Sequence, residues 1–242
     1  MAKQQAPQSL DLNNHINKSE DFVNKNKKTI IIALVAVVVL VLAGIGCHSW
    51  LKNRNDKAQE QISLGMRYYY TGVFQNDTES LNKALKGDGT QYAGFLQIAN
   101  KYSHTDGANL AHAYAGECYA HLGDFKNAIK ELEAFSPQSD ESVTPAILGC
   151  LADCYANNKQ VDKAIDTFKK AADKADNESL SPLFLIKAGQ LLESQNKADE
   201  AKALYEKVKN DYPTSAYSMP QPQSENLVIA PEIDKYIERA TK

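Results

Sequence analysis

The side chains in this 242-residue sequence that could do chemistry are four cysteines and five histidines. Cys150 precedes Cys154 by one helical turn, and Cys118 lies 36 residues before Cys154. Side chains four residues apart on a helix are held too far apart for an undistorted disulfide, so no Cys150–Cys154 bridge is expected. A bridge from Cys118 to either of these two residues stays open beside the alternative of buried free thiols, which pack as small apolar side chains.

Catalysis, metal binding and cofactor binding are not expected. The sequence has no CxxC pair and no suitably spaced histidine to complete a zinc site. Gly87-Asp88-Gly89 is a tight-turn signal, and no Gly-Lys-Ser or Gly-Lys-Thr follows it to form a phosphate loop. None of the histidines lies in an HExxH or nucleophile-elbow context; they are His15, His48, His104, His112 and His121.

The elements that position these side chains repeat three times between Asn109 and Pro213. In each unit a small residue precedes a large one by three positions, and after a polar turn an alanine precedes a second large residue by four. A period in the mid-thirties indicates stacked helical hairpins, in which the small residues allow close helix approach. The four columns are Gly116, Ala152 and Gly189; Tyr119, Tyr155 and Leu192; Ala128, Ala164 and Ala201; and Leu132, Phe168 and Tyr205.

These columns resemble positions 8, 11, 20 and 24 of the tetratricopeptide repeat (TPR) family. The departures are position 4, occupied by His112, Leu148 and Leu185, and the closing proline, which occurs only as Pro213. The resemblance implies an all-α solenoid of about four hairpins over residues 48–214, which binds proteins and does no catalysis. Its units are expected at residues 109–144, 145–181 and 182–214, preceded by an atypical, lengthened unit at residues 57–108.

In a TPR superhelix, positions 2, 5, 9 and 12 of each first helix line the inner face. The resemblance therefore implies a groove of small, apolar and acidic residues, without the Lys, Asn and Arg by which some TPR domains grip carboxylate tails. We expect an apolar or basic helical segment as the partner, while the alternative is that the acids only solvate the groove. Positions 2, 5 and 9 are Leu110, Ala113 and Glu117, then Ala146, Gly149 and Asp153, then Leu183, Ile186 and Gln190; position 12 adds Ala120, Ala156 and Glu193.

Residues 29–47 read TIIIALVAVVVLVLAGIGC, and no charged residue occurs from Thr29 until Lys52. Such a run covers roughly 30 Å as a helix and is longer than the apolar region of a cleaved signal. It predicts a transmembrane anchor, and the alternative is lipid attachment at Cys47, because Gly44-Ile45-Gly46 loosely resembles a bacterial lipobox. The anchor is represented by Ile30, Leu34, Val38 and Leu42, with Trp50 at the interface.

The segments that flank the anchor and the repeats have their own composition. Residues 1–28 are polar and predict a disordered tail. Its cytoplasmic side is indicated by the four lysines nearest the span, Lys18, Lys25, Lys27 and Lys28, against three basic residues that follow the span. Residues 215–230 are rich in Pro, Gln and Ser and predict a linker. Residues 231–242 predict a helix that begins at Pro231 and either caps the array or lies in its groove.

Charge and architecture exclude two classes of partner. Of the 30 acidic and 27 basic residues, three and five lie in the first 47, so the remainder carries five more negative than positive charges. Without a basic excess there is no electrostatic basis for nucleic-acid binding. A solenoid offers extended surface and few enclosed pockets, so no small-molecule substrate is expected either.

The layout of a short inside tail, one N-terminal span and a compact TPR domain resembles the ancillary subunit of the bacterial Sec translocon. That family of periplasmic TPR proteins is related to cell-division coordinators, and the resemblance covers residues 18 to 213. It implies an inner-membrane protein with a cytoplasmic N-terminus and a periplasmic TPR domain, a scaffold or chaperone adaptor for translocon subunits or envelope clients. The alternative is a fixed scaffold for outer-membrane assembly, cell division or cell-wall synthesis; with repeats facing a cytosol, the chain would instead resemble an organellar import receptor.

Overall fold

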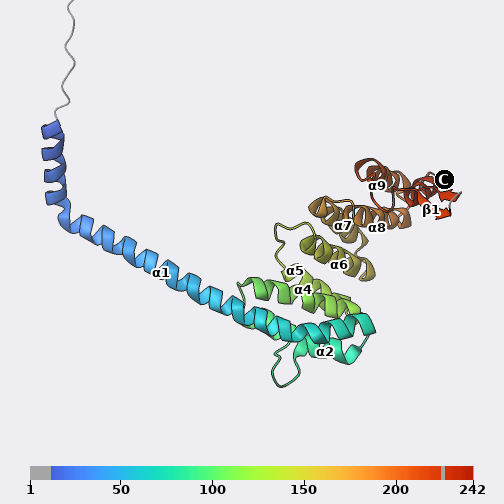
Figure 1. Cartoon of the computed structure of the whole chain (residues 1–242), viewed down its shortest axis with the longest axis horizontal. Coiled ribbons are helices and arrows are strands. Elements are labelled where there is room, and N and C mark those ends of the chain that lie inside the picture. Colours follow the sequence, from blue (N-terminus) through green and yellow to red (C-terminus); the bar gives the residue numbers. More distant parts are fainter. Residues whose placement is uncertain (1–11, 225–226, 242) are drawn as a thin grey trace, which may run out of the picture. The chain divides into compact units, whose positions relative to one another are not determined.

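The computed structural model describes residues 12–224 and 227–241. Contacts divide the chain into residues 1–53 and 54–242, and each part is described by itself. Ten helices and two short strands are found in the described residues, and Figure 1 labels most of them in chain order. The predicted all-α fold is confirmed, with one short two-stranded ribbon near the C-terminus.

The first part is helical from Leu12, where α1 (Leu12–Gln75) begins. The expected disordered tail is therefore wrong from residue 12 onward, while residues 1–11 lie outside the described residues. A physical reason is that extending a helix already formed by the apolar run needs no new nucleus.

The apolar side chains of α1 are open over the predicted anchor. Leu34, Val38 and Leu42 are 61%, 55% and 62% exposed, and none of the residues in the most apolar 18-residue window is buried. By length and composition this helix can cross a membrane. Such a continuous apolar surface is unusual for a helix surrounded by water.

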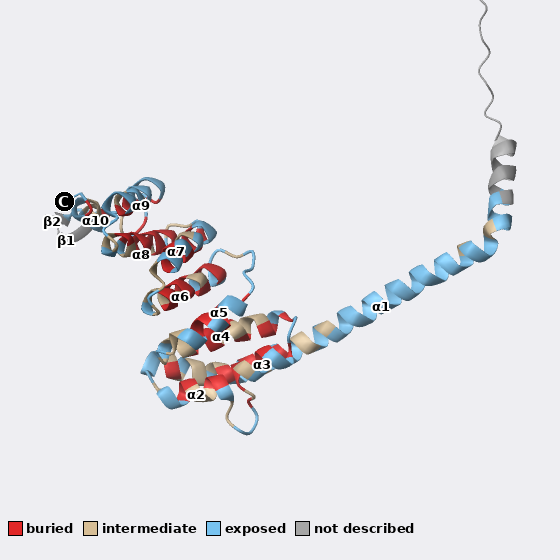
Figure 2. Cartoon of the chain, turned by 180° about the vertical axis from the view of Figure 1, so that it is seen from behind, coloured by how far each residue is buried: buried red, intermediate tan, exposed pale blue. Residues whose placement is uncertain are grey.

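The second part is a series of helical hairpins in which each helix packs against the next. The first hairpin pairs the last residues of α1, from Arg54 on, with α3 (Phe95–Lys101), and α2 (Thr78–Lys86) lies between them in the chain. Figure 2 shows buried residues concentrated where these helices face one another. The next three hairpins are α4 (Asp106–His121) with α5 (Phe125–Ala134), α6 (Val143–Asn157) with α7 (Val161–Ala175), and α8 (Ser181–Ser194) with α9 (Ala198–Asp211).

The repeat columns meet as their sizes predict. A methyl group on Gly116 would overlap the Leu132 side chain, and one on Gly189 would overlap the Tyr205 ring. Tyr205 and Leu132 are almost completely buried. In these two hairpins the glycine thus makes room for the large residue on the second helix, which confirms the close helix approach inferred from the sequence.

Helix α2 occupies the lengthened region of the first unit. The carboxylate of Asp77 accepts the backbone N–H groups of Glu79 and Ser80, which caps the first turn of the helix. In the turn that follows, Oδ1 of Asp88 accepts the backbone N–H groups of Thr90, Gln91 and Tyr92 at 2.9–3.1 Å. Those hydrogen bonds make Gly87-Asp88-Gly89 a structural turn.

The C-terminal helix caps the array. Helix α10 (Glu232–Arg239) packs on α9, where Ile233 is fully buried and the ring of Tyr236 lies 5.3 Å from that of Tyr205. This settles the choice between cap and groove in favour of the cap. The expected linker contains an antiparallel ribbon of β1 (Gln221–Ser224) and β2 (Leu227–Ile229).

Candidate partner-binding surface

The predicted groove residues lie on the first helices of the hairpins, α4, α6 and α8, but only some of them are open. Ala113, Gly149 and Ile186 are buried among neighbouring helices. A methyl group on Gly149 would overlap the ring of Phe184, so position 5 of that repeat is a helix contact. Ala146 and Gln190 are exposed, and the half-buried remainder is Leu110, Glu117, Asp153 and Leu183. That the nine residues bind a partner stays a prediction.

Glu117 connects the first two repeats. Its Oε2 accepts a hydrogen bond from the hydroxyl of Tyr69 on α1, at 2.5 Å. Burial raises the pKa of the Glu117 carboxyl, although the hydrogen bond from Tyr69 and the charge of His121 lower it. Burial and the neighbouring carboxylate also raise the pKa of Tyr69 well above its usual range, so the phenol stays a donor.

Aromatic rings surround this hydrogen bond. The ring of Tyr69 lies edge-on to that of Tyr114 at 5.0 Å and to that of Tyr70 at 5.6 Å. Tyr70 stacks on Phe74 at 5.9 Å, and Tyr114 stacks on buried Phe95 at 5.2 Å. The side chains of Tyr70 and Phe74 are 51% and 77% exposed. We name Tyr69, Tyr70, Phe74, Tyr114 and Glu117 the aromatic–acidic face.

Sequence reasoning missed most of this face. It identified Glu117 at position 9 but not Tyr114, which lies at position 6 of the same helix. Lys187 lies at position 6 of α8, and its Nζ is 2.7 Å from the carboxylate of Asp153. At both places a position-6 side chain interacts with an acid of the inner face. Tyr114 interacts with Glu117 of its own helix, and Lys187 pairs with Asp153 of the preceding repeat. The run of three tyrosines that ends at Tyr70 was the available signal.

The acids of the later repeats already have cationic partners. Asp153 pairs with Lys187, as described above. Glu193 accepts two hydrogen bonds from the guanidinium of Arg239 on α10, at 3.0 and 2.5 Å, and one from the hydroxyl of Tyr205 at 3.1 Å. Their charges are therefore balanced within the chain.

The thiols and His112 are structural. The four cysteines are free, and Cys118 and Cys154 are buried. Burial raises the pKa of Cys118 to about 12, and the hydrogen bond with Cys154, together with burial, raises the pKa of Cys150. Nδ1 of His112 lies 2.8 Å from Oε2 of Glu131 within the α4–α5 hairpin. In the described residues no three His, Cys, Asp or Glu side chains gather as metal ligands.

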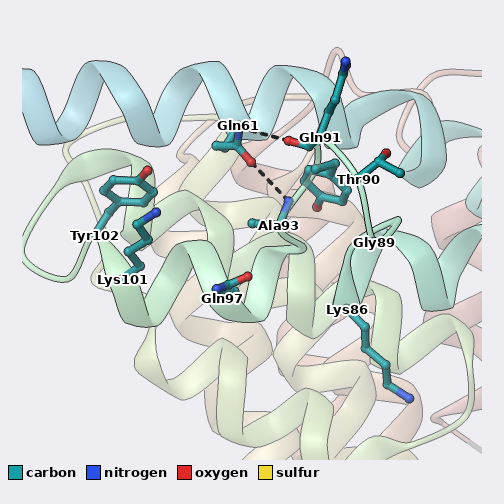
Figure 3. Close-up of a pocket in the computed structure, with 10 residues that line it drawn as sticks. Gln61, Lys86, Gly89, Thr90, Gln91, Ala93, Gln97, Lys101 and Tyr102 are labelled. Carbon is teal, nitrogen blue, oxygen red and sulfur yellow. Dashed lines mark hydrogen bonds between the residues drawn. The ribbon is translucent and has the colours of Figure 1, made fainter.

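Figure 3 shows a pocket of about 390 Å³ beside the Asp88 turn. Gln61 of α1 closes one side of it, because its amide donates to the carbonyl of Gln91 at 3.3 Å and accepts the N–H of Ala93 at 3.1 Å. Lys86 lines the pocket but points away from Gln61. These hydrogen bonds hold the inserted loop against α1. The pocket is therefore explained by the packing of this loop.

Comparison with known proteins agrees with the hairpin architecture. The family model described as tetratricopeptide repeat-like domain matches residues 20–228. Among curated proteins, none matches this sequence.

Two solved structures are similar in fold. Both are crystal structures of nearly identical TPR-like repeats from Podosopora anserina, provisionally assigned as a kinesin light chain, and the second carries a single glutamine-to-methionine substitution. The first has 16% sequence identity and a TM-score of 0.51, and the alignment covers 77% of this chain and 86% of that one. The second has 15% identity and a TM-score of 0.52, covering 77% and 85%.

Proposed function

Because the chain belongs to the family of tetratricopeptide repeat-like domains, we propose that it is a membrane-anchored scaffold that binds other proteins through the inner face of its repeats. TPR-like repeats generally mediate protein–protein interaction without catalysis. The observation that carries the proposal is the aromatic–acidic face. There Tyr69, the donor to Glu117, contacts the exposed ring of Tyr70, which stacks on the exposed ring of Phe74. Exposed aromatic side chains of this kind are typical of protein-binding surfaces.

The anchor in this proposal is residues 29–47. It is supported by the exposure of the apolar side chains of α1 and by the length of the uncharged run. The lysines before the run favour a cytoplasmic N-terminus, which would leave the repeats on the outer side of a bacterial inner membrane. Protease protection of the repeats in intact spheroplasts would contradict this orientation.

The finer proposal is an adaptor beside the Sec translocon, which receives or hands on envelope proteins. It is supported by the order of segments: a short tail, a single apolar helix and a repeat domain. The alternative is a fixed scaffold for outer-membrane assembly, cell division or cell-wall synthesis. A chaperone adaptor slows aggregation of unfolded envelope proteins, whereas a fixed scaffold leaves it unchanged.

Affinity purification of the intact protein from native membranes in mild detergent tests the proposal. The unchanged protein is compared with Glu117→Lys, which reverses the charge of the aromatic–acidic face, and with Asp166→Lys, which changes an exposed acid on α7. We expect translocon subunits or envelope clients to co-purify, and Glu117→Lys to release a set of them while Asp166→Lys keeps them. Purification of the protein alone would contradict a binding scaffold. Cell-wall or outer-membrane assembly proteins in place of translocon subunits would favour the fixed scaffold.

A further inference from the structure

Besides the Tyr236–Glu232 hydrogen bond within helix α10, three tyrosine–glutamate hydrogen bonds recur along the hairpins. Tyr69 donates to Glu117, Tyr155 donates to Glu133 at 2.5 Å, and Tyr205 donates to Glu193 at 3.1 Å. Each joins a phenol to a carboxylate, so each leaves a negative charge beside an aromatic ring. Such a combination suits a cation, which can pair with the carboxylate and lie over the ring.

Two of the three pairs have a cation supplied by the chain itself. The guanidinium of Arg239 pairs with Glu193 and lies 5.1 Å from the ring centroid of Tyr236, which packs on Tyr205. The ammonium of Lys163 lies 5.2 Å from the ring centroid of Tyr155.

The pair in the aromatic–acidic face differs from the other two. Glu133 and Glu117 both form no ion pair with Lys or Arg in the described part of the chain, but a lysine lies over the ring of Tyr155. In the same described residues no Lys or Arg lies over the ring of Tyr69 or Tyr114, and the hydrogen-bond donor to Glu117 is the neutral phenol of Tyr69. The imidazole of His121 acts on this carboxylate only through its charge. A half-buried carboxylate without an ion pair to Lys or Arg is costly to keep, and an external cation in contact with it would offset that cost.

We propose that the aromatic–acidic face binds an arginine or lysine side chain of a partner protein, within a segment whose adjoining residues are apolar. The cation takes at Glu117 the place that Arg239 takes at Glu193, and the apolar neighbours pack on Tyr70 and Phe74. Arginine suits the site better than lysine, because its planar guanidinium can stack on an aromatic ring while it donates two hydrogen bonds. The inference rests on the proposed function, and it adds which side chain of the partner is recognised and which residues of this chain recognise it.

The test measures binding of defined probes to the full chain in phosphatidylcholine nanodiscs by fluorescence anisotropy. The probe is a fluorescein-labelled 15-residue peptide of Ala, Leu, Gln and Ser with one central Arg, and its matched forms carry norleucine or Glu at that position. We expect the arginine probe to bind about tenfold more tightly than the norleucine probe. Equal binding of the two, or no binding of the arginine probe up to millimolar protein, overturns the proposal.

Variants locate the site. Glu117→Gln keeps an acceptor for Tyr69 and should reduce binding of the arginine probe about tenfold without affecting the norleucine probe. Phe74→Ala should weaken both probes. The matched control is Asp166→Asn, an exposed acid on the second helix α7 and outside the predicted groove, so probe binding should not change.

A charge-reversal variant distinguishes loss of the binding site from loss of folding. Glu117→Lys should bind the glutamate probe in preference to the arginine probe, and circular dichroism checks that the variant is helical. An unchanged preference for arginine in either Glu117 variant places the cation elsewhere and overturns the proposal. If native partners co-purify and stay bound to both Glu117 variants, only the inference fails. If the arginine probe binds as described but no partner co-purifies, only the proposed function fails.

Discussion

Glu117 and Glu131 lie on adjacent helices, and folding shifts the pKa values of their carboxyl groups in opposite directions. Burial raises the pKa of Glu117, whereas the hydrogen bond with His112 lowers the pKa of Glu131. A carboxyl group whose pKa is raised by folding favours the folded state below its unfolded pKa of about 4.3 and loses this contribution as the pH rises through the folded pKa. A group whose pKa is lowered contributes above the unfolded pKa and loses the contribution as the pH falls.

This difference gives a paired prediction. Glu117→Gln should raise the melting temperature at pH 7, because it removes a buried charge and keeps an acceptor for Tyr69. Glu131→Gln should lower the stability at pH 7 by about 1 kcal/mol, because it removes a charged acceptor from His112. The Glu117 difference should shrink as the pH falls towards about 4, and the Glu131 difference as the pH falls below about 4.

Thermal unfolding of the full chain in nanodiscs at several pH values, followed by circular dichroism, measures the pair. A Glu117→Gln variant less stable than the unchanged protein at pH 7 would show that the carboxylate stabilises the fold in its charged form. The fold would then have its own use for this charge, and no external cation would be needed to explain it.

At this scale the sequence located Glu117 through its repeat position but not its donor. Tyr69 lies 48 residues earlier, in a unit whose spacing departs from the repeat. Periodicity shows which face of a helix carries a residue, but not which side chain of the neighbouring helix it meets. The repeat position of Cys118 left a free thiol and a bridge as alternatives, and the thiol is free in the structure. The Asp153–Lys187 pair was not predicted, because it joins helices of two repeats.

At the scale of elements, helix α10 stabilises the last hairpin. Ile233 is fully buried in the cluster that contains Phe184, Leu192 and Tyr205. Ile233→Ala should therefore lower the free energy of unfolding by about 2–5 kcal/mol. Tyr236 and Arg239 are more exposed than Ile233. The Arg239–Glu193 ion pair has one exposed partner, Arg239, so it should contribute less than Ile233 does, about 1 kcal/mol.

Urea unfolding of the full chain in nanodiscs, with Arg239→Ala as the matched variant on the same helix, measures this contribution. We expect a large shift of the midpoint for Ile233→Ala and a small one for Arg239→Ala. Equal and small shifts would mean that α10 lies on the array without being part of its core.

The sequence predicted helices where the repeat pattern was regular and failed where local signals competed. Helix α2 lies in the lengthened first unit, where the repeat pattern does not apply, although Asp77 and Glu79 form an N-terminal capping signal. The β1–β2 ribbon lies in a Pro- and Gln-rich segment where composition indicated a linker. A strand of three or four residues is too short to show an alternating pattern.

At the scale of the whole molecule, the proposed anchor should decide where the protein is found. Deletion of residues 29–47 should move the repeats from the membrane pellet to the supernatant, because it removes the continuous apolar run. The unchanged protein should stay in the pellet after carbonate extraction.

The control for this experiment is Cys47→Ser, which removes the thiol that a lipid would modify and keeps the apolar run. It should stay with the membrane as the unchanged protein does. Its release into the supernatant would show that a lipid at Cys47 holds the protein. Globomycin offers a second check, since it causes only a lipoprotein precursor to accumulate.

The cap described at the last hairpin has a consequence for how such a chain can change its length. Helix α10 is fitted to one particular hairpin, through Tyr205, Glu193 and Lys209. A gene duplication that copies an internal hairpin leaves this fit intact, since the new unit meets neighbours of its own kind. A hairpin added after α9 would separate α10 from the residues that it contacts on the last hairpin. The array can therefore lengthen by duplication of internal hairpins, while the last hairpin and α10 stay together.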